Sequence, residues 1–293
     1  MRVVFIGAVE FSLRTLEHLV TIDANIVGVC TLQESKFNAD HVDLSGFCKV
    51  RGIPSHYVQD INSAETLAWI LGKSPDIIFC FGWSILIKQE LLKLAPLGIV
   101  GFHPTLLPAN RGRHPLIWAL VLGLKKTGST FFFMDSNADS GDILSQKEIY
   151  IGEEDDARIL YDKVVQVALI QLNELLPQLA SGSFQRKKQL VSLSNVWRKR
   201  SMVDGQIDWR MSAQSIHNLV RGLAPPYVGA HFLHYGNNVK VLKTALILDA
   251  PDYFEPGKIM YQSSNDIVVK CGVGALSLLV TEPKLNEILG DYL

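Results

Sequence analysis

Paired cysteines are missing from this sequence of 293 residues. Its four cysteines are far apart and form no CxxC motif, so we expect neither a disulfide framework nor a zinc site. They are Cys30, Cys48, Cys80 and Cys271. The N-terminal apolar run ends at Glu10, too early for a signal peptide, and no apolar stretch is long enough to cross a bilayer. These absences predict a cytoplasmic protein that holds no metal and enters no membrane.

Net charge is also nearly absent. The formal charge is −1 and the isoelectric point is near 6.7, so the whole chain has no general attraction for nucleic acid. Basic side chains gather only locally, in residues 186–188 and 198–200. Most such runs are solvated surface or linker, although local charge is enough to contact a phosphate backbone.

Two common nucleotide signatures are missing as well. The turn after the first predicted strand, residues 7–12, reads GAVEFS and lacks the GxGxxG spacing of dinucleotide-binding folds. No P-loop lysine pattern occurs anywhere in the chain. A dinucleotide or nucleoside triphosphate cofactor is therefore not favoured.

What the first part of the chain contains is an alternation of apolar strands and amphipathic helices. Such an alternation predicts right-handed βαβ units and a Rossmann-like, mostly parallel sheet in an α/β domain. Strands are expected at residues 2–8, 24–32, 53–58, 76–81, 99–102 and 129–134, and helices at 11–22, 42–50, 64–71, 88–94, 116–122 and 155–179.

The pattern changes after residue 182. Residues 183–204 combine Gly, Ser and clustered charge with little periodicity, which predicts a linker between domains 1–182 and 205–293. Beyond a helix at 213–223, short strands separated by turn residues predict a small OB-like β-barrel. Those strands are expected at 230–235, 239–247, 258–261, 267–271 and 276–281.

The first candidate for chemistry is the pair His103 and Asp139. His103 ends a buried strand before Pro104, and Asp139 lies in a glycine-bearing turn after another strand. Such residues meet where two strands of a parallel sheet end, and a carboxylate beside an imidazole suits proton transfer and oxyanion stabilisation. Ser140 and Thr105 have no nucleophile motif around them, which favours transfer between two bound substrates over a covalent intermediate.

Two loops flank this pair. Arg111 and Arg113 are solubilising surface residues or, beside the site, planar forks for an anion or a carbonyl group. Phe81 and Trp83 follow the preceding strand, where they are core aromatics or the wall of a flat heteroaromatic ligand.

Together these residues resemble the signature of the folate-dependent formyltransferases. His103, the run 106–108, Arg111-Gly112 and the DSGD run 139–142 carry the central resemblance. The opening residues 5–12 and the segments 207–209, 216–219 and 225–230 extend it to nearly the whole chain. The C-terminal segments are similar to the second domain of the tRNA and aminoarabinose-type members.

The resemblance implies transfer of a formyl group from 10-formyltetrahydrofolate to an amine, with His103 and Asp139 as catalytic residues. It implies folate binding by a turn and a loop, and acceptor binding by the first strand turn and the arginine loop. The folate residues would be Phe81, Gly82, Trp83, Ser84, Ile85, Leu86, Asn137 and Asp142, and the acceptor residues Ser12, Arg111 and Arg113.

One position departs from the family, whose members use an Asn-x-His pair. Gly101 stands at the Asn position. Loss of one oxyanion donor costs about 2.7–4 kcal/mol of transition-state stabilisation, so either another donor substitutes or the enzyme is slow. Asn110 and Asn137 lie in the flanking loops and are candidates for that donor.

The acceptor is the least determined part of this interpretation. With a net charge of −1, we expect a nucleotide-linked amino sugar ahead of methionyl-tRNA, because a tRNA partner needs many phosphate contacts. Two further alternatives stay open, a non-catalytic binding homologue, which Gly101 suggests, and a hydrolase that deformylates the folate. A homodimer is also left open.

Overall fold

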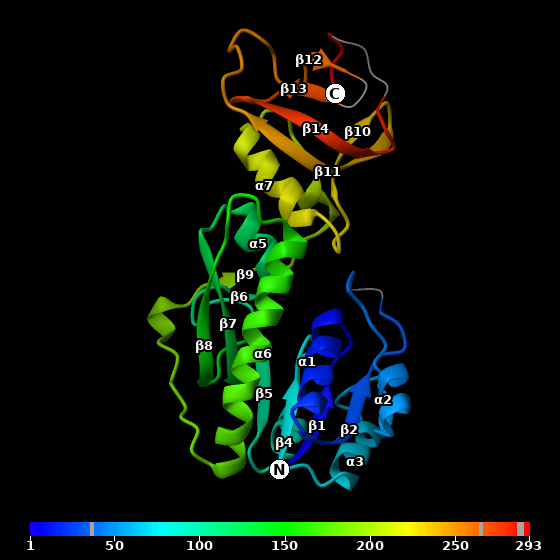
Figure 1. Cartoon of the computed structure of the whole chain (residues 1–293), viewed down its shortest axis with the longest axis vertical. Coiled ribbons are helices and arrows are strands. Elements are labelled where there is room, and N and C mark those ends of the chain that lie inside the picture. The colour runs from blue at the N-terminus through cyan, green and yellow to red at the C-terminus, as the bar shows by residue number, and fades with distance from the viewer. Residues whose placement is uncertain (36–37, 264–265, 286–289) are drawn as a thin grey trace. The chain divides into compact units, whose positions relative to one another are not determined.

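The computed structural model describes residues 1–35, 38–263, 266–285 and 290–293. The chain forms two compact units (Figure 1). The first comprises Met1–Pro115, Thr127–Ile149 and Asp162–Trp197, and the second comprises Leu116–Lys126, Tyr150–Tyr161 and Arg198–Leu293.

A seven-stranded sheet in the order β3-β2-β1-β4-β5-β7-β8 forms the centre of the first unit. The first five strands in this order, β3, β2, β1, β4 and β5, pair in parallel, which confirms the Rossmann-like prediction. The strands are β1 (Arg2–Ile6), β2 (Asn25–Thr31), β3 (Ser55–Tyr57), β4 (Ile77–Cys80), β5 (Ile99–His103), β7 (Lys126–Phe133) and β8 (Ile143–Tyr150).

Both faces of this sheet are buried, because successive residues of the central strands point to opposite sides. Phe5 and Phe79 lie with Phe81 on one face, where their ring centroids are 5.5 and 5.3 Å from that of Phe81. Val4 and Ile78 belong to the apolar cluster on the other face. A central strand that is buried on both faces therefore requires apolar residues at every position.

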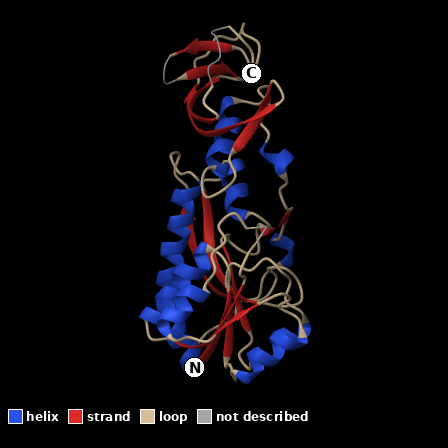
Figure 2. Ribbon diagram, turned by 90° about the vertical axis from the view of Figure 1, so that its right-hand side faces the viewer, coloured by secondary structure: helices blue, strands red, loops and turns tan. Residues whose placement is uncertain are grey.

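Helices cover the strands on both sides (Figure 2). Those of the first unit are α1 (Glu10–Thr21), α2 (Ser45–Arg51), α3 (Ala64–Gly72), α4 (Gln89–Leu92) and most of α6 (Ala157–Ser181), whereas α5 (Pro115–Val121) belongs almost entirely to the second unit. Ser63 begins α3 by accepting a hydrogen bond from the Thr66 amide, the usual role of a serine N-cap. An ion pair of 2.5 Å between Arg14 and Asp162 joins α1 to α6.

The sheet differs from the prediction at one edge. Strand β7 runs antiparallel to β5, and Phe133 at its end pairs with Val100 near the beginning of β5. The expectation that His103 and Asp139 follow two parallel strands is therefore wrong. Strand β8 was not predicted at all, since its sequence ILSQKEIY mixes polar and apolar residues at an edge that is half exposed.

The segment predicted as a linker contains local structure. It includes the 3₁₀ helices η1 (Val191–Leu193) and η2 (Met202–Gly205) and strand β9 (Val196–Trp197). Strand β9 pairs in parallel with β6 (Arg111–Gly112), so this segment lies directly beside the arginine loop.

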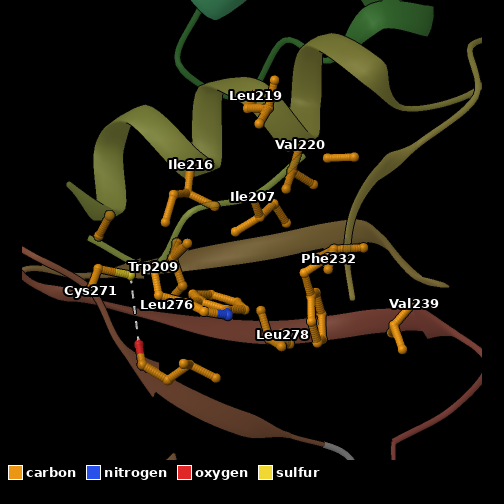
Figure 3. Close-up of a cluster of buried hydrophobic side chains, with 14 of the residues drawn as sticks. Ile207, Trp209, Ile216, Leu219, Val220, Phe232, Val239, Cys271, Leu276 and Leu278 are labelled. Carbon is orange, nitrogen blue, oxygen red and sulfur yellow. Dashed lines mark hydrogen bonds between the residues drawn. The ribbon is translucent and has the colours of Figure 1, made fainter. Parts of the chain in front are cut away.

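The second unit contains the predicted β domain, a five-stranded antiparallel sheet in the order β10-β11-β14-β13-β12. Helix α7 (Ala213–Leu223) packs on it, and Ile216, Trp209 and Leu276 belong to their shared apolar core (Figure 3). The strands are β10 (Ala230–His234), β11 (Asn237–Ile247), β12 (Ile259–Gln262), β13 (Ile267–Lys270) and β14 (Ala275–Glu282).

Among the described residues, none of the helices combines the length and the apolar character that crossing a membrane requires.

Candidate active site

His103 occupies the last position of β5 and is 95% buried, with 5% of its surface exposed. Its Nε2 lies 2.8 Å from the carbonyl oxygen of Asn110. Since a carbonyl only accepts, Nε2 carries the hydrogen and donates it. The ring is thereby fixed with Nδ1 directed to the side where Asp139 lies.

Asp139 reaches this ring from the connection between β7 and β8. Its Oδ2 lies 3.7 Å from His103 Nδ1, which is ion-pair distance rather than a hydrogen bond. The same oxygen accepts a hydrogen bond of 2.9 Å from the Gly112 amide. Asp139 also has a φ of +54°, a left-handed conformation that a non-glycine residue adopts only when its surroundings hold it there.

The structure thus brings together the two predicted catalytic side chains although one strand direction was predicted incorrectly. Because Nε2 is the donor to Asn110, Nδ1 is the ring nitrogen that can take up a proton or pass one to a departing group beside Asp139.

The turn after β4 presents main chain and two apolar side chains. Gly82 has a φ of +67°, and a Cβ there would lie 2.2 Å from Val9 Cγ2, so the turn requires glycine. Ile85 and Leu86 are exposed beyond it. Ser84 Oγ donates to Asn38 Oδ1 at 3.2 Å. Exposed apolar groups beside the main chain of a glycine turn suit a flat, polar-edged ring such as a pterin.

The aromatic residues of this turn face the protein. Phe81 is fully buried among the phenylalanines of the sheet, so only its main chain can meet a ligand. Trp83 packs against the apolar cluster that includes Val4, and its Nε1 is buried without a hydrogen-bond partner among the described residues.

Three other predicted site residues have structural contacts. Ser12 is fully buried, accepts from the amides of Ala8 and Val9, and donates to Phe81 O at 2.6 Å. Asn137 is exposed, and its amide donates to Asp135. The carbonyl of Asp142 accepts from the Phe133 amide at 2.8 Å.

The two arginines are already engaged. Arg111 donates from Nε and Nη2 to Gln189 Oε1, at 3.1 and 2.7 Å. Arg113 is exposed and donates from Nη2 to Ser84 O at 2.8 Å, which links the arginine loop to the turn after β4. Acceptor binding by either arginine would use its remaining N–H groups.

Gly101 lies in a space that excludes a side chain. A Cβ at this position would be 2.9 Å from Met134 Cγ and 3.0 Å from Phe132 Cζ. The asparagine of the family pattern therefore does not fit here without movement of both neighbours. Asn110, one predicted substitute, does lie beside the site, since its carbonyl holds His103.

Sequence reasoning missed Gln189 and Asn195, which come from the segment predicted as a linker. Gln189 Nε2 donates to the carbonyls of Asp139 and Gly141, at 2.9 and 2.7 Å. Asn195 Oδ1 accepts from the Asn110 amide at 2.7 Å. A two-residue β pairing leaves no periodic signal, so nothing local in the sequence marks this segment.

Comparisons with known proteins follow the same division of the chain. The model of the "Formyl transferase" family matches residues 2–176. The model of its "C-terminal domain" matches residues 200–289. Among the described residues, no group of three or more His, Cys, Asp or Glu side chains could hold a metal ion.

Two curated relatives match over nearly their whole length. A methionyl-tRNA formyltransferase of Geobacter metallireducens is 31% identical over 282 residues, 95% of this chain and 89% of the relative. One of Citrifermentans bemidjiense is 33% identical over 300 residues, 100% of this chain and 93% of the relative.

Solved structures share the fold at lower identity. WlaRD, a sugar 3N-formyl transferase solved in the presence of dTdp and 5-N-Formyl-THF, has a TM-score of 0.70 and 17% identity, covering 98% of this chain and 99% of its own. An N-formyltransferase from Helicobacter canadensis, in complex with folinic acid and dTDP-3-aminofucose, has a TM-score of 0.69 and 14% identity, covering 94% and 98%. At these identities the similarity concerns the fold.

Proposed function

This chain belongs to the formyl transferase family, and we propose that it transfers the formyl group of 10-formyltetrahydrofolate to the amine of methionyl-tRNA. The observation that carries the choice of acceptor is the full-length similarity, at 31% and 33% identity, to methionyl-tRNA formyltransferases. This reverses the ranking expected from net charge, which put a nucleotide-linked amino sugar first.

Local charge supports the tRNA acceptor where the net charge of −1 does not. Arg186, Lys187 and Lys188 are exposed, one to three residues before Gln189, which contacts the Asp139 loop. Phosphate groups of a nucleic acid bound at this segment would lie near the reacting amine, and such contacts supply most of a protein's affinity for nucleic acid.

Folate binding would use the turn after β4 and the Asp139 loop. When bound, the folate supplies an activated formyl carbon. The main chain at Gly82 and Trp83 would offer donors and acceptors to a pterin edge, and Ile85 and Leu86 would offer an apolar face. The half-buried ring of Trp83 packs on the apolar cluster of the sheet and supports this turn.

His103 and Asp139 would transfer the proton and stabilise the charge that develops in the reaction. Nδ1 of His103 would take up the proton that leaves the attacking amine, because Nε2 already carries a hydrogen and donates it to the Asn110 carbonyl. The imidazolium formed in this step would stabilise negative charge that develops on the formyl oxygen and then pass the proton to the departing folate nitrogen, and Asp139 would stabilise the imidazolium. Asp139 stays oriented through its bond from the Gly112 amide.

An amino-sugar nucleotide is the second candidate acceptor, and the near-neutral charge of the chain favours it. A sugar nucleotide presents one diphosphate, so the free N–H groups of Arg111 and Arg113 are sufficient for its recognition.

The test is acceptor KM against ionic strength for methionyl-tRNA and for amino-sugar nucleotides. Turnover with the tRNA and a steep rise of KM with salt is the expected result. Lys188→Gln should reduce the slope of log KM against log salt by about one, as for the loss of one phosphate contact. The matched control is Lys49→Gln, which removes one exposed charge from α2 and should leave the slope unchanged.

Turnover with a sugar nucleotide alone, with a shallow salt dependence, would overturn the assignment of the acceptor and leave formyl transfer itself in place.

A further inference from the structure

Residues 189–197, which we call the strap, run along the loops that carry the catalytic pair. Their main chain bonds to the arginine loop, where the amides of Arg111 and Arg113 donate to Asn195 O and Trp197 O, at 3.1 and 3.0 Å. Strand β9, at the end of the strap, forms the parallel pairing with β6. The strap is thus attached to the loop that lies between His103 and Asp139.

Gln189, at one end of the strap, holds the Asp139 loop by its side-chain amide. Its Oε1 accepts from Arg111, so its Nε2 is the atom that bonds to the carbonyls of Asp139 and Gly141. The orientation of the amide is determined by its partners, since guanidinium groups only donate and carbonyls only accept. Gln189 therefore clamps the peptide of a residue whose φ of +54° needs external support.

Asn195, near the other end, acts on the histidine through one intermediate residue. Its Oδ1 accepts from the Asn110 amide, and the carbonyl of Asn110 accepts from His103 Nε2. Asn110 has a φ of +64°, so it too holds a left-handed conformation. The side chain of Asn195 thereby fixes the residue that orients the imidazole.

We propose that Gln189 and Asn195 are positioning residues for formyl transfer, Gln189 through Asp139 and Asn195 through Asn110 and His103. The proposal rests on the formyl transfer proposed above and is independent of which amine is the acceptor. Neither residue needs to contact a substrate. Each maintains the 3.7 Å separation of His103 Nδ1 from Asp139 Oδ2.

Gln189 uses both the oxygen and the nitrogen of its side-chain amide, whereas Asn195 uses the oxygen, which makes an amide-to-acid change diagnostic. Gln189→Glu keeps an acceptor for Arg111 but loses both donor bonds and turns a carboxylate toward two carbonyls. Asn195→Asp keeps Oδ1, the one side-chain atom of Asn195 that bonds to another described residue, and leaves its main-chain carbonyl unchanged. The same substitution chemistry should therefore damage one position and spare the other.

The first measurement is steady-state formyl transfer to whichever amine the wild-type protein uses. We expect Gln189→Glu to lower kcat about 10- to 100-fold, because small misplacements of catalytic groups cost this much. Acceptor KM should change less than about threefold, since Arg111 keeps its partner. Asn195→Asp should stay within about threefold of wild type, whereas Asn195→Leu should lose kcat about 10-fold. Gln185→Glu, an exposed neighbour with the same change of charge, is the control.

The second measurement separates positioning from general stabilisation. In an Asp139→Asn background, Gln189→Glu should cost little further activity, because its effect passes through Asp139. Hydrogen exchange of peptides covering residues 134–142, without substrates, should accelerate in Gln189→Glu and match wild type in Asn195→Asp and Gln185→Glu.

Several results would overturn the proposal. One is a Gln189→Glu variant whose kcat and hydrogen exchange match those of wild type. Another is an Asn195→Asp variant that loses as much kcat as Asn195→Leu. The third is a double variant, Gln189→Glu with Asp139→Asn, whose loss of kcat equals the product of the two single losses. If the wild-type protein formylates no amine, the proposed function fails, and hydrogen exchange still tests whether Gln189 holds the Asp139 loop.

Discussion

The two compact units use buried polar side chains in different ways. In the first unit they hold the loops of the candidate site, as Gln189 holds the side chain of Arg111 and the peptide of Asp139. In the second unit they complete turns around an apolar core. Lys270 is 2% exposed and donates from Nζ to the carbonyl of Cys271 at 2.9 Å. Arg221 donates to the carbonyls of Gly152 and Asp155, at 3.1 and 3.0 Å.

Two histidines, His103 in the first unit and His217 in the second, show the same difference. His103 lies beside a carboxylate, with one ring nitrogen fixed by a carbonyl and the other near Asp139. His217 bonds to the Thr244 hydroxyl at 2.9 Å, and its pKa is lowered by burial and by the nearby Arg221. The first arrangement leaves one ring nitrogen beside a carboxylate, where it can exchange a proton with a substrate, and the second favours a neutral ring that serves stability. Substitutions should therefore cost activity in the first unit and stability in the second.

The largest effect is expected at the catalytic pair. His103→Ala and Asp139→Asn should each lower kcat by roughly 10²–10⁴-fold, the usual contribution of a positioned acid or base. Thermal unfolding should change little, since neither side chain belongs to the apolar core. Steady-state kinetics checks the loss of kcat, and calorimetry checks the thermal unfolding. Near wild-type turnover in either variant would show that the site is assigned incorrectly.

The opposite result is expected in the core of the second unit. Ile216 is fully buried against the sheet, so Ile216→Ala should lower the free energy of unfolding by about 2–5 kcal/mol. Turnover at 25 °C with saturating substrates should stay near that of wild type. A loss of kcat as large as that in His103→Ala would contradict the expectation that substitutions in the second unit cost stability rather than activity.

Gly101→Asn tests a position where a substitution can change both the stability and the activity of the first unit. It recreates the family pattern, but the new Cβ would lie 2.9 Å from Met134 Cγ. We expect a stability loss of about 1–3 kcal/mol from overpacking, with no gain in kcat. Gly46→Asn, where a Cβ has no neighbour within 4 Å, is the control. Higher turnover in Gly101→Asn would mean that the missing donor limits this enzyme.

Most of the fold could be predicted because most of its helices and strands have a clear local pattern in the sequence. Apolar strands such as β4 and amphipathic helices such as α6 carry their own period, and turn residues separate the strands of the C-terminal sheet. Strand β8 carries no clear period, and the antiparallel direction of β7 depends on its pairing with β5. Gln189 and Asn195 could not be found, since their role comes from contacts 50 and 85 residues distant in the sequence.

The smallest effect concerns pH and the second unit. The pKa of His217 is lowered in the folded state, whereas an unfolded histidine titrates near 6.5. Below about pH 6.5 the unfolded state binds the extra proton, so stability falls as pH decreases toward the lowered pKa. His217→Gln should flatten this part of the stability curve, as urea unfolding between about pH 7 and 5 would reveal. An unchanged slope would mean that His217 is not neutral in the folded protein.

The most direct test of the account is the release of tetrahydrofolate from 10-formyltetrahydrofolate by the purified protein, with and without methionyl-tRNA. We predict release only when the amine is present, one formyl-methionyl-tRNA formed for each tetrahydrofolate, and loss of both products in Asp139→Asn. Release without any amine would indicate a hydrolase. No release with the tRNA or with amino-sugar nucleotides would indicate a binding protein, and either result would contradict the assignment of the first unit as a formyl-transferring site.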